Sequence, residues 1–137
     1  MESRISEMKA NYRELIDTTI AIDYLRDVEL AVNYLESRVN SGYPLYCSVI
    51  TKIEVYAGMR PNEKDEILDF FSIVLSIDVN DIIAEKSGEY LRRYQKNHGI
   101  NVPDAIIAAS AHLLNCELIT LNVKHFPMKD IEVVVPY

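Results

Sequence analysis

The sequence has little of what small extracellular and membrane proteins depend on. Its 137 residues contain no tryptophan and only two cysteines, Cys47 and Cys116, which form no C-x-x-C pair. Cysteines so far apart predict reduced, buried, small apolar side chains rather than a disulfide framework or a zinc site. No apolar run approaches the roughly 18 residues of a membrane span, and we expect no membrane association.

Glycine and proline are also scarce, with four and five residues, and no stretch resembles a flexible linker. We therefore predict a single domain over residues 1–137, in which residues 1–11 form a polar N-terminal extension. A chain of this length buries roughly two-thirds of its unfolded surface, so one core suffices without a metal or a disulfide. The charged start lacks the apolar segment of a secretory signal, which predicts a cytoplasmic protein.

Positively charged residues are also few. The 14 lysines and arginines are outnumbered by 21 aspartates and glutamates, giving a net charge of −7. Domains that hold nucleic acid through bulk charge usually carry a basic excess that displaces phosphate counterions. The composition therefore argues against strong nonspecific nucleic-acid binding, and any anionic substrate must be recruited locally.

Short apolar runs alternate with longer helical patterns along the whole chain. This alternation predicts an α/β fold of three layers, α/β/α, around a central, mainly parallel sheet. Ligand sites in such folds lie outside the carboxyl ends of the strands. We expect strands at 15–16, 44–49, 73–77, 117–121 and 131–135, and helices at 20–39, 50–57, 63–71, from Asn80 or Asp81 to His98, and from Pro103–Asp104 onward.

Polar residues stand at several of these strand ends. Asp17 follows the first expected strand, Asn122 follows the strand at 117–121, and Asp104 opens the alanine-rich helix. Each also has a purely structural interpretation, because Asp17 and Asp104 suit the first turn of a helix and Asn122 suits a turn.

Glu54 is a fourth candidate. It shares a helical face with Ile50, Ile53 and Ala57, and this spacing predicts that the face looks inward. An unpaired buried carboxylate costs several kcal/mol, so we expect a cation, a hydrogen-bond network or a wet pocket beside it. The alternative is a different helix register, with Glu54 exposed.

Convergence of Asp17, Glu54 and Asp104 would concentrate negative charge in one place. At about 5 Å each charged pair would repel by roughly 3 kcal/mol at an effective dielectric near 20. Mg²⁺ or Mn²⁺, which prefer oxygen ligands, would offset this repulsion and bridge the carboxylates to a phosphate. Such an ion can also activate a water molecule.

Four segments together resemble PIN-domain ribonucleases, especially the VapC toxins of prokaryotic toxin–antitoxin pairs. The likeness extends over about residues 14–136, and its strength lies in the order and spacing of the four segments. They are Leu-Ile-Asp-Thr-Thr at 15–19, Ile-Thr-Lys-Ile-Glu-Val-Tyr-Ala-Gly at 50–58, Val-Pro-Asp-Ala-Ile-Ile-Ala-Ala-Ser-Ala at 102–111 and Leu-Ile-Thr-Leu-Asn-Val-Lys-His-Phe at 118–126.

The resemblance implies a Mg²⁺- or Mn²⁺-dependent endoribonuclease that acts on RNA. It assigns the metal and the attacking water to Asp17, Glu54 and Asp104. Asn122 stands where the wider family has a fourth acid, which would weaken a second metal site, and the hydroxyls of Thr18 and Thr120 would support the acidic cluster. The family likeness also implies a homodimer and a cognate antitoxin protein. The polar stretch before the first strand is longer here than is common in the family.

The histidines and the basic residues have simpler interpretations. The histidines His98, His112 and His125 are too widely spaced to pair on zinc within one helical turn, and we expect each to be ordinary rather than catalytic. Candidate RNA contacts come from the few basic residues near the expected groove, chiefly Lys52, Arg60 and Lys124.

Two other enzyme or signalling classes fit less well. A receiver domain also has an acidic Mg²⁺ pocket, and Lys124 invites that comparison, but two threonines follow Asp17 where a receiver has its acidic pair. A haloacid dehalogenase phosphatase needs a second aspartate where Thr19 stands. A PIN fold that only binds RNA or acts as a scaffold is disfavoured because the three carboxylates are present.

Overall fold

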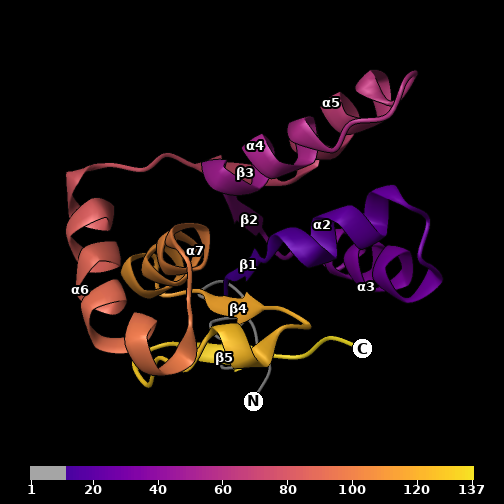
Figure 1. Cartoon of the computed structure of the whole chain (residues 1–137). Helices are drawn as coiled ribbons and strands as arrows, with labels where there is room; N and C mark the ends of the chain where they lie inside the picture. Colours follow the sequence, from indigo (N-terminus) through magenta and orange to yellow (C-terminus); the bar gives the residue numbers. More distant parts are fainter. Residues whose placement is uncertain (1–11) are drawn as a thin grey trace, which may run out of the picture.

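Short parallel strands form the centre of the protein, whose computed structural model describes residues 12–137 (Figure 1). Within these residues one sheet has the order β3-β2-β1-β4-β5, and every neighbouring pair is parallel. The predicted extension at residues 1–11 lies outside the described part. The strands are β1 (Glu14–Ile16), β2 (Leu45–Ser48), β3 (Leu75–Ile77), β4 (Glu117–Ile119) and β5 (Glu132–Val134).

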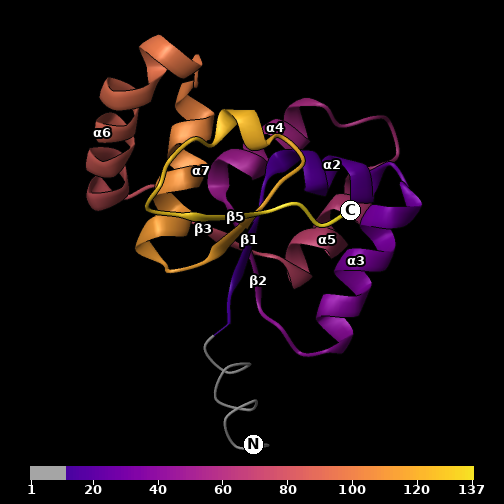
Figure 2. The same ribbon diagram turned by 90° about the horizontal axis from the view of Figure 1, so that it is seen from below.

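Helices cover both faces of this sheet, which confirms the predicted three-layer α/β/α architecture. Alternate strand residues point to opposite layers: Leu15 and Leu118 pack with α6 and α7, whereas Ile16 and Ile119 pack with α2 to α5. The two views show these helix groups on opposite sides (Figures 1 and 2). The helices are α2 (Thr18–Leu25), α3 (Glu29–Asn40), α4 (Val49–Ala57), α5 (Lys64–Ile73), α6 (Asp81–His98), α7 (Val102–Leu113) and the 3₁₀ turn η1 (Val123–His125).

The single helix expected over residues 20–39 is wrong, because the chain breaks between α2 and α3. Asp27 adopts a left-handed conformation with φ 59°. This conformation cannot continue a right-handed helix, and α3 restarts at Glu29 without a side-chain cap from Val28. The apolar spacing runs through the break, so periodicity alone could not show it.

Substitutions at Asp27 test the cost of this turn. Asp27→Val should lower the free energy of unfolding by about 1–2 kcal/mol, because a β-branched residue is strained at positive φ. Asp27→Asn should stay close to wild type, because asparagine tolerates the left-handed region. Urea unfolding of both variants measures the difference, and equal stabilities would contradict this account of the helix break.

Both cysteines are free and buried, as predicted. Burial raises the pKa of the Cys47 thiol to about 12 and that of Cys116 to about 11, so both thiols stay protonated at neutral pH. Over residues 12–137, the helices are all too short or too polar to pass through a bilayer.

A buried ion pair closes the amino end of the sheet. Glu14, at the start of β1, is fully buried, and its Oε1 lies 2.9 Å from Arg38 Nε on α3. The Tyr34 hydroxyl donates a hydrogen bond to Glu14 Oε2. The Arg38 guanidinium also lies 5.0 Å from the Tyr34 ring centroid and 5.4 Å from that of Tyr43. The charge of Glu14 is therefore offset inside the fold.

Asp130 ties the β4–β5 connection to the helices on one face of the sheet. Its Oδ1 accepts a hydrogen bond from the Tyr90 hydroxyl at 2.7 Å, and its Oδ2 lies 2.8 Å from Lys86 Nζ. Burial works to raise the pKa of Asp130, but these two partners hold it below its ordinary value. Phe126 and Met128, both buried, anchor the same connection in the core.

Candidate active site

The sheet order reverses between β1 and β4, and the candidate site lies at their carboxyl ends. The two strands are neighbours although about a hundred residues separate them in sequence, and Asp17 N donates to Ile119 O at 2.9 Å. In open parallel sheets this reversal opens a crevice for ligands. The fold therefore places the residues that follow β1 and β4 side by side.

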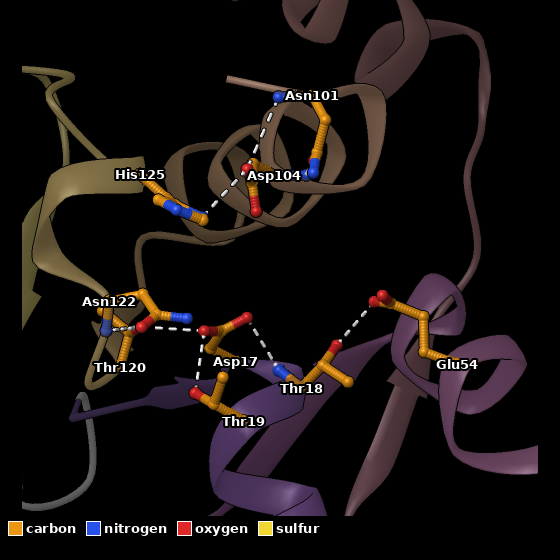
Figure 3. A network of polar contacts seen from close by, with 9 residues as sticks. All are labelled: Asp17, Thr18, Thr19, Glu54, Asn101, Asp104, Thr120, Asn122 and His125. Atoms are coloured by element: carbon orange, nitrogen blue, oxygen red, sulfur yellow. Dashed lines mark hydrogen bonds and ion pairs between the residues drawn. The ribbon is translucent and has the colours of Figure 1, made fainter. Parts of the chain in front are cut away.

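Asp17 occupies the end of β1 with both carboxylate oxygens engaged (Figure 3). Its side chain is buried and caps α2, with Oδ1 accepting from Thr18 N at 2.7 Å. Its Oδ2 accepts from the hydroxyls of Thr19 at 3.0 Å and Thr120 at 2.8 Å. Asp17 therefore caps α2 and is also held by Thr120, the residue that follows β4.

Glu54 lies on α4, but the inward face predicted for this helix is wrong. Thr51 and Val55 are the buried residues of α4, whereas Glu54 is exposed and Ile53 is 59% exposed. The Thr51 hydroxyl pairs with the Thr18 hydroxyl at 2.9 Å inside the core.

Glu54 still reaches the site through Thr18. The Thr18 hydroxyl donates to Glu54 Oε1 at 2.8 Å, which links α4 to the first turn of α2. Because a hydroxyl has one proton to donate, Thr51 must then be the donor in its contact with Thr18. Thr18 therefore positions Glu54 directly, as expected of a supporting hydroxyl.

Asp104 lies in the first turn of α7 within a capping box. Asn101 Oδ1 accepts from Asp104 N at 2.8 Å, and Asp104 Oδ2 accepts from Asn101 N at 3.4 Å. Burial raises the pKa of Asp104 and the negative charge of Asp17 raises it further, against the lowering effects of Asn101 and His125. Asp17 and Asp104 thus repel one another in the folded protein.

The turn after β4 brings two residues to the same side. Asn122 N donates to Thr120 Oγ1 at 2.9 Å, and His125 Nδ1 lies 3.4 Å from Asp104 Oδ2. We expected His125 to be ordinary rather than catalytic, and its contact with Asp104 is a feature that the sequence did not indicate. A spacing of three residues in a 3₁₀ turn, where side chains eclipse, is the signal that could have placed His125 with Asn122.

The three basic candidates differ in their surroundings. Lys52 Nζ lies 5.1 Å from the centroid of the Phe71 ring, and Arg60 and Lys124 are exposed. Lys124 belongs to η1, the same turn as His125. Their contact with RNA stays a prediction.

The three candidate carboxylates supply the oxygen ligands that a hard divalent cation prefers. Figure 3 shows the carboxylates of Asp17, Glu54 and Asp104 around a common opening, on three different elements. All three supply oxygen ligands, and the repulsion between Asp17 and Asp104 is a cost that a cation would offset. Across residues 12–137, however, no three His, Cys, Asp or Glu side chains lie close enough together to hold an ion as they stand.

A separate pocket of about 380 Å³ lies between α3 and α5. Its lining is mostly apolar, with Leu35, Phe70 and Val74 among its residues, and it includes none of the three candidate carboxylates. This pocket therefore lies outside the candidate site at the strand ends.

The fold, with Asp17 beside the reversal of its sheet, agrees with a family assignment from the sequence. The sequence profile described as PIN domain matches residues 15–130. The chain therefore belongs to the PIN domain family, as the sequence resemblance indicated.

Curated relatives and solved structures agree with this assignment. The chain is 40% identical over 116 residues to Ribonuclease VapC19 of Mycobacterium tuberculosis, covering 84% of this chain and 93% of the relative. It is 36% identical over 115 residues to Ribonuclease VapC10 of the same organism, covering 83% and 86%. A toxin–antitoxin complex from Klebsiella pneumoniae contains a chain of the same fold, with a TM-score of 0.74 and 32% identity over 90% of this chain and 98% of that one.

Proposed function

We propose that the protein is a divalent-metal-dependent endoribonuclease and the toxin of a toxin–antitoxin pair. The observation that carries this proposal is that Asp17, Glu54 and Asp104 face the same side of the sheet reversal in a PIN domain. Relatives at 40% and 36% identity are named ribonucleases, which supports RNA as the substrate.

Each carboxylate has its own support for this task. Asp17, Glu54 and Asp104 would hold Mg²⁺ or Mn²⁺, which supplies an activated water and neutralises charge on a phosphodiester. Thr19 and Thr120 fix the Asp17 carboxylate, Thr18 fixes Glu54, and Asn101 fixes Asp104. In-line attack by water would leave a 5′-phosphate and a 3′-hydroxyl.

A cleavage assay tests the proposal. Purified protein should cut RNA in the presence of Mg²⁺ or Mn²⁺, and chelation by EDTA should stop cleavage because the carboxylates alone supply no activated water. Products whose 3′ ends can be ligated without prior phosphatase treatment carry the expected 3′-hydroxyl. Cleavage that persists in EDTA would contradict the metal dependence, and 2′,3′-cyclic phosphate ends would contradict the attack by water.

A protein partner follows from the solved neighbours. Two chains of this fold come from structures whose names refer to toxin–antitoxin systems, from Klebsiella pneumoniae and Mycobacterium tuberculosis. We propose a cognate antitoxin, a homodimer and a cytoplasmic location. Co-expression with the product of a small neighbouring reading frame should yield a complex without nuclease activity, and light scattering of the protein alone should give twice the chain mass.

A further inference from the structure

The three histidines have very different surroundings, and His125 alone touches a candidate metal ligand. His98 packs edge-on against Tyr94, and His112 Nδ1 lies 3.0 Å from the backbone oxygen of Asp130. His125 Nδ1 faces Asp104 Oδ2 at 3.4 Å (Figure 3). The resemblance to the family gave no role to this residue, so its contact needs its own explanation.

The contact divides the two oxygens of Asp104 into different environments. Oδ2 faces both His125 Nδ1 and Asn101 N, whereas Oδ1 has no hydrogen-bond partner within residues 12–137. In Figure 3 this second oxygen points toward the opening that Asp17 also faces. One oxygen is therefore held by the protein and the other is left available for a ligand.

The backbone holds His125 where it can maintain this contact. His125 N donates to Asn122 O at 3.0 Å inside η1, and the next residue, Phe126, is buried. Asp130 fixes the far end of the same connection through Tyr90. The imidazole itself has 52% of its side chain exposed, so its Nε2 can remain in solvent while Nδ1 faces inward.

We propose that His125 is a positioning residue of the metal site: its Nδ1–H holds Oδ2 of Asp104 so that Oδ1 is presented to the divalent cation. This inference rests on the proposed function. An imidazole in this role is the neutral tautomer protonated on Nδ1, with Nε2 as an acceptor. Partners that orient a ligating carboxylate typically contribute about 10–100-fold to metal affinity.

Mn²⁺ binding tests the proposal without any need for turnover. The amide nitrogen of asparagine takes the position of Nδ1, whereas that of glutamine takes the position of Nε2. His125→Ala and His125→Gln should therefore weaken Mn²⁺ binding, measured by electron paramagnetic resonance, by about 10-fold or more, and His125→Asn should remain within about threefold of wild type. His98→Asn is the matched control and should bind as wild type, because His98 packs against Tyr94 and makes no hydrogen bond or ion pair with the three carboxylates within residues 12–137.

The outcomes separate this inference from the proposed function. If wild type and all three His125 variants bind Mn²⁺ equally, or if glutamine restores binding as well as asparagine, the positioning role is wrong while the metal site stands. If wild type binds no Mn²⁺, the proposed function falls and this inference with it. Nitrogen-15 spectra of the unliganded wild-type protein above neutral pH give a second measurement that needs no variant: an Nε2–H tautomer at His125 would overturn the proposal.

Discussion

Asp17→Asn should reduce RNA cleavage by more than about 100-fold and leave the protein folded. The variant removes the charge that would hold the cation but keeps the shape of the side chain. Asparagine is as good a helix cap as aspartate, so its Oδ1 can still accept from Thr18 N. The hydroxyls of Thr19 and Thr120 can reverse and accept from the new amide.

Cleavage rates under single-turnover conditions with Mn²⁺ are the measurement for Asp17→Asn, together with thermal unfolding. Asp27→Asn is the matched control, because it removes one negative charge from an exposed turn near the end of the same helix. We expect wild-type cleavage from the control. Comparable cleavage by both variants would show that Asp17 does not belong to the active site.

Arg38→Met should lower the free energy of unfolding by about 3–5 kcal/mol at neutral pH. The change leaves the carboxylate of Glu14 fully buried without its cation. Glu14 Oε1 and Arg38 Nε make no aligned hydrogen bond with each other or with other described residues, so the variant removes charge attraction, together with the contacts of the guanidinium with the Tyr34 and Tyr43 rings. Methionine preserves much of the apolar volume of the arginine stem.

The loss should shrink as the pH falls. Burial raises the pKa of Glu14, against the lowering effects of Tyr34 and Arg38, so the folded protein binds this proton more tightly than the unfolded chain does. Proton binding by Glu14 therefore stabilises the folded protein. This stabilisation is complete below the ordinary pKa of 4.5 and is lost as the pH rises through the pKa of Glu14 in the folded protein. Removing Arg38 raises the folded pKa further, so the penalty is greatest when Glu14 must be charged.

Urea unfolding of Arg38→Met at several pH values measures both effects. The double variant Glu14→Gln/Arg38→Met is the control, because it has no charge to bury and its stability should vary less with pH. A penalty for Arg38→Met that is the same at acidic and neutral pH would show that lost packing, and not the charge of Glu14, causes the destabilisation.

Strand ends and buried helices could be predicted because their patterns are local. Ile16 is followed at once by Asp17, and the alanine-rich run after Asp104 is apolar on every side, which left few alternatives. The break at Asp27 could not be predicted, because the apolar spacing of α2 and α3 continues through it and only the backbone angle reveals it.

The site was predictable in its acids and less so in its contacts. Asp17 directly follows β1 and Asp104 lies in the first turn of α7, which are the positions that the sequence pattern indicated for them. The register of α4 depends on Thr51 being buried against Thr18, a pairing between distant segments that hydropathy cannot show. His125 depends in the same way on how η1 lies against α7, which no local pattern sets.

The strand β1 carries a buried carboxylate at its start and another just beyond its end. Glu14 is matched by Arg38, whereas Asp17 forms no ion pair with lysine or arginine within residues 12–137 and repels Asp104. Neutralising Asp17 would remove this repulsion, whereas removing Arg38 leaves the buried charge of Glu14 without its cation. On the proposed function, a single substitution at Asp17 would therefore end the activity at a smaller cost in stability than a substitution at Glu14 or Arg38.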